Sequence, residues 1–193
     1  MIYQITCTKI LQEINTQIKH SNKSYLLIFD LDDTVFNTIH RKFYIYKNFL
    51  RKKFSLPKIT LDFHKNYYNF LALLENNIIF QENKSEILKL YTDLFLSESF
   101  LSLDKPFFGV ESFIQKLSVF KIQVVFLTGR PSNSMKKGTY AILNKYELLK
   151  HPNEENYLFM KKNPKKADLI FKKMSNQDNG PMIFNHHLIQ KIS

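Results

Sequence analysis

The amino-acid sequence predicts an α/β fold of three layers, in which helices cover a parallel β-sheet and a helical insertion interrupts the alternation. Two short runs, residues 25–30 and 122–127, are almost continuously apolar, as is typical of parallel strands buried on both faces. Between them, apolar residues recur at three- and four-residue steps over residues 37–104, which indicates helices. Strands that alternate with helices favour a parallel sheet between helical layers.

The first part of the sequence predicts an amphipathic helix, because its apolar residues have helical spacing at Ile10, Leu11, Ile14 and Ile18. This segment lacks the basic start and continuous apolar core of a signal peptide. No apolar run approaches the ~20 residues that a membrane-crossing helix needs. The single cysteine, Cys7, cannot form an intramolecular disulfide, so we expect a reducing, cytoplasmic compartment.

The second half of the sequence returns to alternating helices and strands. A turn at residues 106–109 comes before a helix whose apolar face contains Val110, Phe113, Ile114 and Leu117. After the strand at 122–127 we expect a helix at 135–149, a strand at 157–160, a helix after Pro164 and a strand at 182–184. The predicted order of these strands across the sheet is third, second, first, fourth. The chain then divides into an α/β core, residues 1–36 and 105–193, and a helical insertion, residues 37–104.

Lysines dominate the basic residues, which limits what the net charge of +11 implies. Only three of the 28 basic residues are arginines, namely Arg41, Arg51 and Arg130. Lysines spread along a whole sequence are typical of a solvated surface, and no nucleic-acid-binding module accompanies them. We therefore expect a mild attraction for anionic substrates, with nucleic acid as an unfavoured alternative substrate.

Three carboxylates follow the first predicted strand within four positions, at Asp30, Asp32 and Asp33. Alternate residues of an extended segment point the same way, so Asp30 and Asp32 converge at the end of the strand, while Asp33 points elsewhere. Two facing carboxylates repel each other, and Mg²⁺ with oxygen ligands relieves that repulsion. The alternative is that the cluster only caps a helix, but a cap needs one such residue.

These motifs resemble those of the haloacid dehalogenase (HAD) superfamily of aspartate-dependent phosphohydrolases. The segment IFDLDDT is similar to the first motif, an apolar strand followed by Asp-x-Asp-x-Thr, and VVFLTGRP is similar to the second, an apolar strand ending in Thr or Ser. The insertion at 37–104 resembles a helical C1-type cap, and PFFGVESFIQKL resembles the usual approach to the second motif. The resemblance implies a HAD-like, Rossmann-like catalytic core with an inserted helical cap.

The resemblance also implies roles for the first motif. Asp30 would attack phosphorus as the nucleophile and form an aspartyl-phosphate. Asp32 would act as general acid toward the leaving oxygen and then as general base toward water, with its backbone carbonyl on the metal. Thr34 would brace the loop and contribute to the substrate-binding side of the motif.

At the second motif, Thr128 would donate a hydrogen bond to a phosphoryl oxygen, and Gly129 would let backbone N–H groups approach the anion. Arg130 would either reach the phosphate or lie on the surface. The third motif is a lysine that neutralises the carboxylate and phosphoryl charge. Its predicted place in the first turn of a helix before the last strand favours Lys166, with Lys165 as the alternative.

The fourth motif departs from the superfamily pattern. Acids that hold Mg²⁺ should follow the last strand, yet Asn185, His186 and His187 stand there. Asn185 can offer a neutral carbonyl oxygen to Mg²⁺, whereas histidine suits softer metals. The predicted metal ligands are thus Asp30, Asp32 and Asn185, and a water-bridged Mg²⁺ site, another metal and a decayed site all stay open.

The sequence therefore predicts a Mg²⁺-dependent phosphatase that hydrolyses phosphate monoesters. Its expected substrate is a phosphorylated small molecule or a nucleotide, and we expect no membrane partner. The alternative is a catalytically degenerate relative that binds a phosphorylated ligand or a protein partner without turnover.

Overall fold

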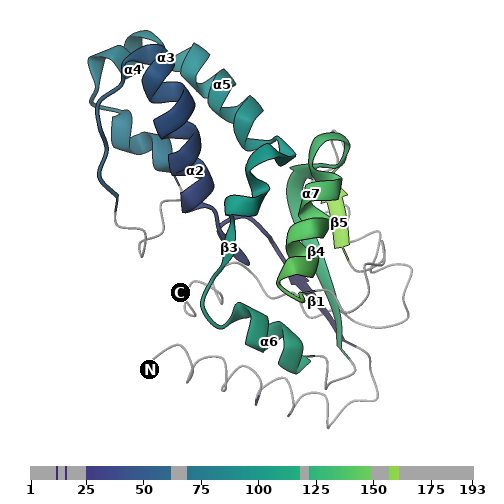
Figure 1. The fold of residues 1–193 in the computed structure, drawn as a ribbon. Coiled ribbons are helices and arrows are strands. Elements are labelled where there is room, and N and C mark those ends of the chain that lie inside the picture. The colour runs from purple at the N-terminus through teal and green to yellow at the C-terminus, as the bar shows by residue number, and fades with distance from the viewer. Residues whose placement is uncertain are drawn as a thin grey trace.

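The main sheet of the protein is parallel and has three strands in the part of the chain that the structure describes. The structure is a computed structural model that describes residues 25–61, 69–117, 122–148 and 157–160, together with Gln12 and Thr16. The strands are β1 (Tyr25–Phe29), β4 (Ile122–Pro131) and β5 (Tyr157–Met160), in the order β1-β4-β5 (Figure 1). This confirms the parallel sheet and the order third, second, first. The strand expected at 182–184 lies outside the described residues.

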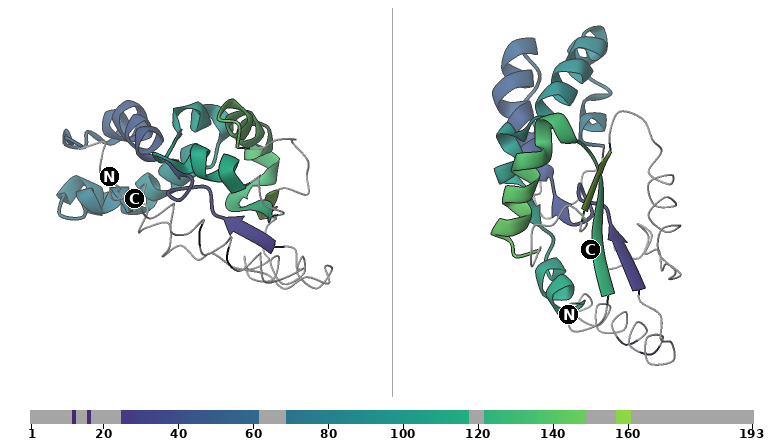
Figure 2. Two further views of the ribbon diagram at one scale, coloured as in Figure 1. Left: turned by 90° about the horizontal axis from the view of Figure 1, so that it is seen from below. Right: turned by 90° about the vertical axis from the view of Figure 1, so that its right-hand side faces the viewer.

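Two helices pack on one side of this sheet, α6 (Val110–Leu117) and α7 (Ser132–Lys145), as the right-hand view of Figure 2 shows. The predicted apolar face of α6 is buried at all four positions. It joins side chains of the strands and of α7 in one hydrophobic cluster, which includes Leu27, Phe29, Phe113, Leu117, Phe126 and Leu143. The fold is therefore α/β. Gln12 and Thr16 are helical, while the rest of the first expected helix and the helix after Pro164 lie outside the described residues.

Strand β4 and helix α7 correct two predicted boundaries. β4 continues past residue 127 to Pro131, because the polar residues after its apolar run stay extended and their pairing with β5 shifts between Thr128 and Pro131. α7 begins at Ser132 and ends at Lys145, whereas we expected 135–149. It ends early because Glu147 takes a left-handed φ of 52°, and the N–H of Leu148 donates to the carbonyl of Leu143.

Several short helices lie between β2 (Phe36–Asn37) and β3 (Lys105–Pro106). They are α2 (Ile39–Ile45), the π-helix η1 (Tyr46–Leu50), α3 (Arg51–Phe54), the 3-10 helix η2 (Phe70–Leu74), α4 (Ile78–Glu82), α5 (Lys84–Phe95) and the 3-10 helix η3 (Glu98–Leu103). We call residues 39–103 the helical segment. Within the described residues, no helix has both the length and the apolar character needed to cross a membrane.

The two ends of the helical segment meet in a short antiparallel ribbon. Strand β2 (Phe36–Asn37) precedes the segment and strand β3 (Lys105–Pro106) follows it, with Phe36 opposite Pro106. A second hydrophobic cluster lies inside the segment and shares no residue with the cluster on the sheet. The division into a core and a cap stays a prediction, but the segment has a hydrophobic interior of its own.

The helical segment also contacts α7, where Gly138 faces η3. A Cβ atom at Gly138 would lie 2.9 Å from Glu98 Cβ and 2.9 Å from Leu101 Cδ1. The N–H of Gly138 donates to Glu98 Oε2 at 3.1 Å, and Ser134 Oγ donates to the carbonyl of Leu96 at 3.0 Å. Glycine thus permits a close approach of α7 and η3 that a larger residue would prevent.

This contact predicts that Gly138→Ala lowers stability. Alanine favours a helix over glycine by about 1 kcal/mol, but the overpacking at Glu98 and Leu101 costs about 1–3 kcal/mol. We expect the clash to outweigh the propensity, so thermal unfolding followed by circular dichroism should give a lower Tm. The exposed Asn144→Ala on the same helix is the control: it introduces alanine without a clash, so helix propensity alone should raise Tm slightly. A Gly138→Ala protein with a Tm above that of the parent would contradict the close approach.

Candidate active site

The two predicted motifs lie side by side at the carboxyl ends of neighbouring strands. Pairing of β1 with β4 runs to Phe29 opposite Phe126, so Asp30 leaves β1 at the level where Leu127 and Thr128 continue β4. Thr128 is buried, and its Oγ1 accepts a hydrogen bond from the Arg130 N–H at 3.2 Å. The register of the sheet therefore brings Asp30 and Thr128 to the same edge.

The loop after β1 is held together by hydrogen bonds to one backbone carbonyl group, that of Leu31. The Leu31 carbonyl accepts hydrogen bonds from the N–H groups of Val35 at 3.0 Å and Phe36 at 2.9 Å, and the Leu31 side chain is fully buried. Thr34 is buried in the same turn. Because Leu31 packs into the core, its neighbours Asp30 and Asp32 are both partly exposed.

Asp33 points away from this edge, as the alternation predicts. It has a left-handed φ of 57°. Its carboxylate accepts hydrogen bonds from the Thr38 hydroxyl at 2.5 Å and the Thr38 N–H at 3.4 Å, and it pairs with Lys42. Asp33 thus holds Thr38, the residue before α2. The N–H of Ile39, the first residue of the helix, donates to Asn37 Oδ1 at 2.9 Å, so the helix-cap alternative is not confirmed for Asp33.

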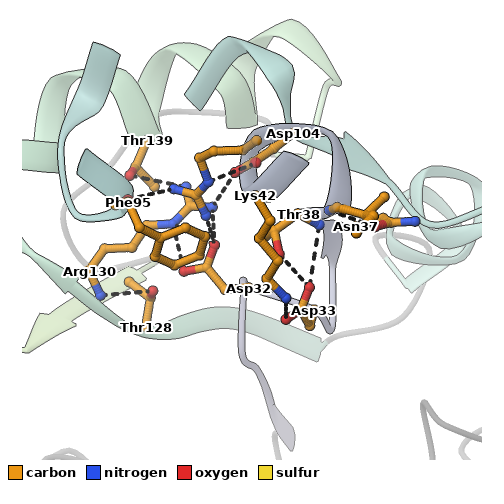
Figure 3. Close-up of polar contacts among 12 residues, drawn as sticks. Asp32, Asp33, Asn37, Thr38, Lys42, Phe95, Asp104, Thr128, Arg130 and Thr139 are labelled. Carbon is orange, nitrogen blue, oxygen red and sulfur yellow. Dashed lines mark hydrogen bonds and ion pairs between the residues drawn. The ribbon is translucent and has the colours of Figure 1, made fainter. Parts of the chain in front are cut away.

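Asp32 belongs to a closed set of four ion pairs, which we call the ion-pair square, made of Asp32, Arg41, Asp104 and Arg130. Figure 3 labels Asp32, Asp104 and Arg130. Each arginine contacts each carboxylate. Arg41 Nη2 lies 2.5 Å from Asp32 Oδ1, and Arg41 Nε lies 3.0 Å from Asp104 Oδ1. Arg130 Nη2 lies 2.7 Å from Asp32 Oδ1 and 2.9 Å from Asp104 Oδ2. Three of the four side chains are fully buried, and Asp32 is 23% exposed.

The arginines have further partners that fix their planes. Arg130 Nε donates to Asp32 Oδ2 at 3.0 Å, and its Nη1 donates to the Thr139 hydroxyl at 3.2 Å. Arg41 Nη1 donates to the carbonyl of Phe95 at 3.2 Å, and its guanidinium lies 3.9 Å from the centre of the Phe95 ring. Both guanidinium groups are therefore held by neutral groups as well as by the carboxylates.

The two carboxylates of the square have opposite pKa shifts. Burial alone would raise the pKa of Asp32, but the charges and hydrogen bonds of Arg130 and Arg41 outweigh it and hold the pKa below its usual value. At Asp104 burial dominates over the same arginines and raises the pKa to about 7. The arrangement therefore favours the ionised form of Asp32, which can accept a proton, over the protonated form, which could donate one.

Asp30 lies within electrostatic reach of the square. Burial alone would lower the pKa of Arg130, but the charges of Asp32, Asp104 and Asp30 act in the other direction and the net pKa is raised. Arg130 is fully buried, so the surface alternative for this residue is wrong. All three of its nitrogens bind groups of the chain, while Gly129 beside it is exposed.

Sequence reasoning missed Arg41 and Asp104 as site residues. Arg41 is nine positions from Asp32 on a different element, and Asp104 lies just before β3. One signal in the sequence could have found Arg41: only three of 28 basic residues are arginines, and two of those three form the square. The predicted Lys165, Lys166, Asn185, His186 and His187 lie outside the described residues.

The residues at this edge fit Mg²⁺ in kind and supply part of a ligand set. Carboxylate oxygen from Asp30 and carbonyl oxygen from Asp32 are the hard donors that Mg²⁺ takes. The Asp32 side chain is committed to the arginines, which agrees with a role for its backbone carbonyl. Among the described residues, no group of three or more His, Cys, Asp or Glu side chains is arranged to hold a metal ion. A magnesium ion here would need Asn185, substrate or water for its other ligands.

An open cleft of about 590 Å³ lies at the start of α7. It is lined by Glu98, Ser132, Asn133, Ser134, Lys136, Lys137 and Tyr140. None of the motif residues lines it, although Ser132 directly follows β4. The cleft is thus next to the second motif along the chain and separate from the ion-pair square.

The raised pKa of Asp104 predicts a pH dependence of stability. The usual carboxyl pKa is 3.8 and the folded value is about 7, so the folded chain binds a proton more readily between these values. The stability that this proton contributes is fully present below about pH 4 and is lost as the pH rises through about 7. Asp32 has the opposite shift, and its contribution is lost only as the pH falls below about 4.

Asp104→Asn removes the first of these titrations. We expect the free energy of unfolding of the variant, relative to that of the parent, to rise as the pH increases from about 4.5 to about 7.5. Urea unfolding at several pH values in that window measures the difference. A difference that stays constant across the window would show that Asp104 does not take up a proton on folding.

Comparison with known proteins gives a weak likeness to two solved structures. No family model and no curated protein matches the sequence. A protein assigned as a beta-phosphoglucomutase from Thermotoga maritima is 16% identical with a TM-score of 0.44, over 83% of this chain and 75% of that one. A predicted phosphatase from Clostridium acetobutylicum is 17% identical with a TM-score of 0.49, over 84% of this chain and 76% of that one. Independently of these two structures, the chain has an α/β fold with a parallel sheet, and its motifs at the ends of β1 and β4 resemble those of the HAD superfamily.

Proposed function

We infer that the protein is a Mg²⁺-dependent phosphatase that hydrolyses phosphate monoesters through an aspartyl-phosphate on Asp30. The observation that carries this inference is the meeting of two motifs: Asp30 and Asp32 leave β1 beside Thr128 on β4. A nucleophile, a proton-accepting carboxylate and a hydroxyl donor at one sheet edge are the groups that phosphoryl transfer to a carboxylate requires.

In the first step a carboxylate oxygen of Asp30 attacks phosphorus, the bond from phosphorus to the leaving oxygen breaks, and the leaving oxygen takes the proton that the Asp32 carboxyl group holds, so that Asp32 ends this step ionised. The Thr128 hydroxyl donates to a phosphoryl oxygen, where negative charge gathers in the transition state. In the second step water attacks phosphorus, gives a proton to Asp32, and displaces the Asp30 carboxylate to release inorganic phosphate. The two arginines favour the ionised form of Asp32, which is the form that the first step leaves and from which the second step begins.

Magnesium, when bound, would neutralise part of the charge that Asp30 and the phosphoryl group bring together. Lys166, or Lys165 in its place, would add a second positive charge as the resemblance implies. The substrate we propose is a phosphorylated small molecule or a nucleotide, since the mild positive charge of the chain favours anions.

Asp30→Asn tests the nucleophile. It keeps the shape of the side chain and removes the attacking charge, so hydrolysis of an aryl phosphate with Mg²⁺ should fall at least about a thousandfold. Asp33→Asn is the matched control: it makes the same change three positions away in a carboxylate that binds Thr38 and Lys42, and asparagine tolerates the left-handed φ. We expect its kcat to stay within about tenfold of the parent.

Circular dichroism shows whether each variant is folded before its rate is compared. Equal rates for Asp30→Asn and the parent would exclude Asp30 as the nucleophile. A folded parent without hydrolysis of any phosphate ester tested would instead support a degenerate relative that binds a phosphorylated ligand without turnover.

The departure in the fourth motif predicts weak magnesium binding in the absence of substrate. Asn185→Asp or His186→Asp restores an acid at this position, and a charged ligand gains more from Mg²⁺ than a neutral one. At least one of the two variants should reach half-maximal hydrolysis at a lower Mg²⁺ concentration than the parent. Titrations with Mn²⁺ and Co²⁺ accompany this experiment, because a parent that works best with those ions uses a softer metal. An unchanged magnesium dependence in both variants would show that neither residue faces the ion.

A further inference from the structure

We propose that Arg41 is a positioning residue for Asp32, and that through it the helical segment completes the active site. This proposal rests on the phosphatase function inferred above. The proposal gives the helical segment a direct part in the chemistry, because Arg41 of α2 contacts Asp32 in the loop after β1.

Arg41 reaches Asp32 from a different element than Arg130 does. Arg130, at the end of β4, holds both oxygens of Asp32 through Nε and Nη2. Arg41 adds a contact of 2.5 Å to Oδ1 from α2. Asp32 is therefore fixed between the sheet and the helical segment, with only one of its two arginines in the α/β part of the fold.

Arg41 is itself placed by residues that follow it far along the chain. The carbonyl of Phe95, at the end of α5, accepts a hydrogen bond from Nη1, and the Phe95 ring covers the guanidinium plane. Asp104, at the exit of the segment, contacts Nε. The position of Arg41 thus depends on the entry, the interior and the exit of the helical segment together.

Loss of Arg41 would remove one ion pair of Asp32 and would also make Asp32 compete with Asp104 for its other partner, Arg130. In the square each carboxylate has two arginines. Without Arg41, the buried Asp104 and Asp32 would share Arg130 alone, and two carboxyl groups would compete for the donors of one guanidinium. We expect Asp32 to lose the orientation that proton transfer needs, because a general base must lie within hydrogen-bond reach of the water it activates.

Lysine should not replace arginine here. A guanidinium has donors on three nitrogens in one plane. Arg41 donates hydrogen bonds from Nη2 to Asp32 and from Nη1 to the carbonyl of Phe95, while its Nε lies 3.0 Å from Asp104 Oδ1 as an ion pair. A lysine ammonium is a single point charge without that fork, and it would be buried at a site where exposure is 0%. The use of arginine in a chain whose basic residues are almost all lysine agrees with this requirement.

A purely structural role is the competing explanation, in which Arg41 only anchors the helical segment. Gly138→Ala tests the anchoring role, because its Cβ would meet Glu98 and Leu101, which join the helical segment to α7 and are not members of the square. Lys53→Gln is a second control: it removes an exposed ion pair with Glu86 from the same segment.

The experiment measures kcat and KM for an aryl phosphate with Mg²⁺ in the parent, Arg41→Gln, Arg41→Lys, Gly138→Ala and Lys53→Gln, at a temperature where each is folded. We expect kcat to fall about a hundredfold in both Arg41 variants while KM changes less than about threefold, as is expected when an interaction of the transition state is lost. The Gly138 and Lys53 variants should keep kcat within about threefold of the parent. An unchanged kcat in Arg41→Gln, or an equal loss in Gly138→Ala, would overturn the proposal.

A second measurement does not depend on turnover. In a double-mutant cycle of Arg41→Gln and Asp32→Asn, followed by urea unfolding, we expect the effects on the unfolding equilibrium constant to depart from additivity by at least about tenfold. Additive effects would show that Arg41 does not hold Asp32. If the parent fails to hydrolyse phosphate esters, the proposed function fails, and the cycle still decides whether Arg41 fixes this carboxylate.

Discussion

The ion-pair square of Asp32, Arg41, Asp104 and Arg130 is the interaction on which the arrangement of the site depends. Removal of four charged groups from water is expensive, and a buried pair often contributes little net stability. Loss of one member is different, because it leaves an uncompensated charge and costs about 3–5 kcal/mol. The square therefore acts more as a constraint than as a source of stability: the loop after β1, α2, the approach to β3 and the end of β4 must all be in place together.

Much of the fold could be predicted because continuous apolar runs and helical periodicity are local signals. The strand at Tyr157–Met160 and the helix at Val110–Leu117 have the predicted positions. The end of β4 does not have its predicted position, because the last residues of this strand are polar and stay extended through pairing with β5. The end of α7 depends on the left-handed backbone of Glu147, a residue with no preference for that conformation.

Some residues of the candidate site could also be predicted from the sequence, and others could not. Asp30, Asp32 and Thr128 could be placed at one edge because strand alternation and sheet order are enough to locate them. The partners of Asp32 could not, since contacts with Arg41 and Arg130 join residues nine and 98 positions away. Nothing in a local pattern shows which of many basic residues is buried. The one feature that distinguishes these two residues in the sequence is that arginine is rare and lysine is common. That feature does not show where either side chain lies in the fold.

The antiparallel ribbon of β2 and β3 brings the first and last residues of the helical segment side by side. With respect to the backbone alone, a segment joined in this way could be exchanged for another. The square removes that freedom, because Arg41 lies inside the segment and Asp104 at its exit, while Asp32 and Arg130 belong to the surrounding fold. A foreign insertion joined at the ribbon would leave Asp32 and Arg130 with only each other as ion-pair partners in the square, unless it brought an arginine and an aspartate to the places of Arg41 and Asp104. The helical segment and the loop after β1 therefore have to be kept together. A change of substrate preference is easier to reach by single substitutions within the segment than by replacing the whole segment.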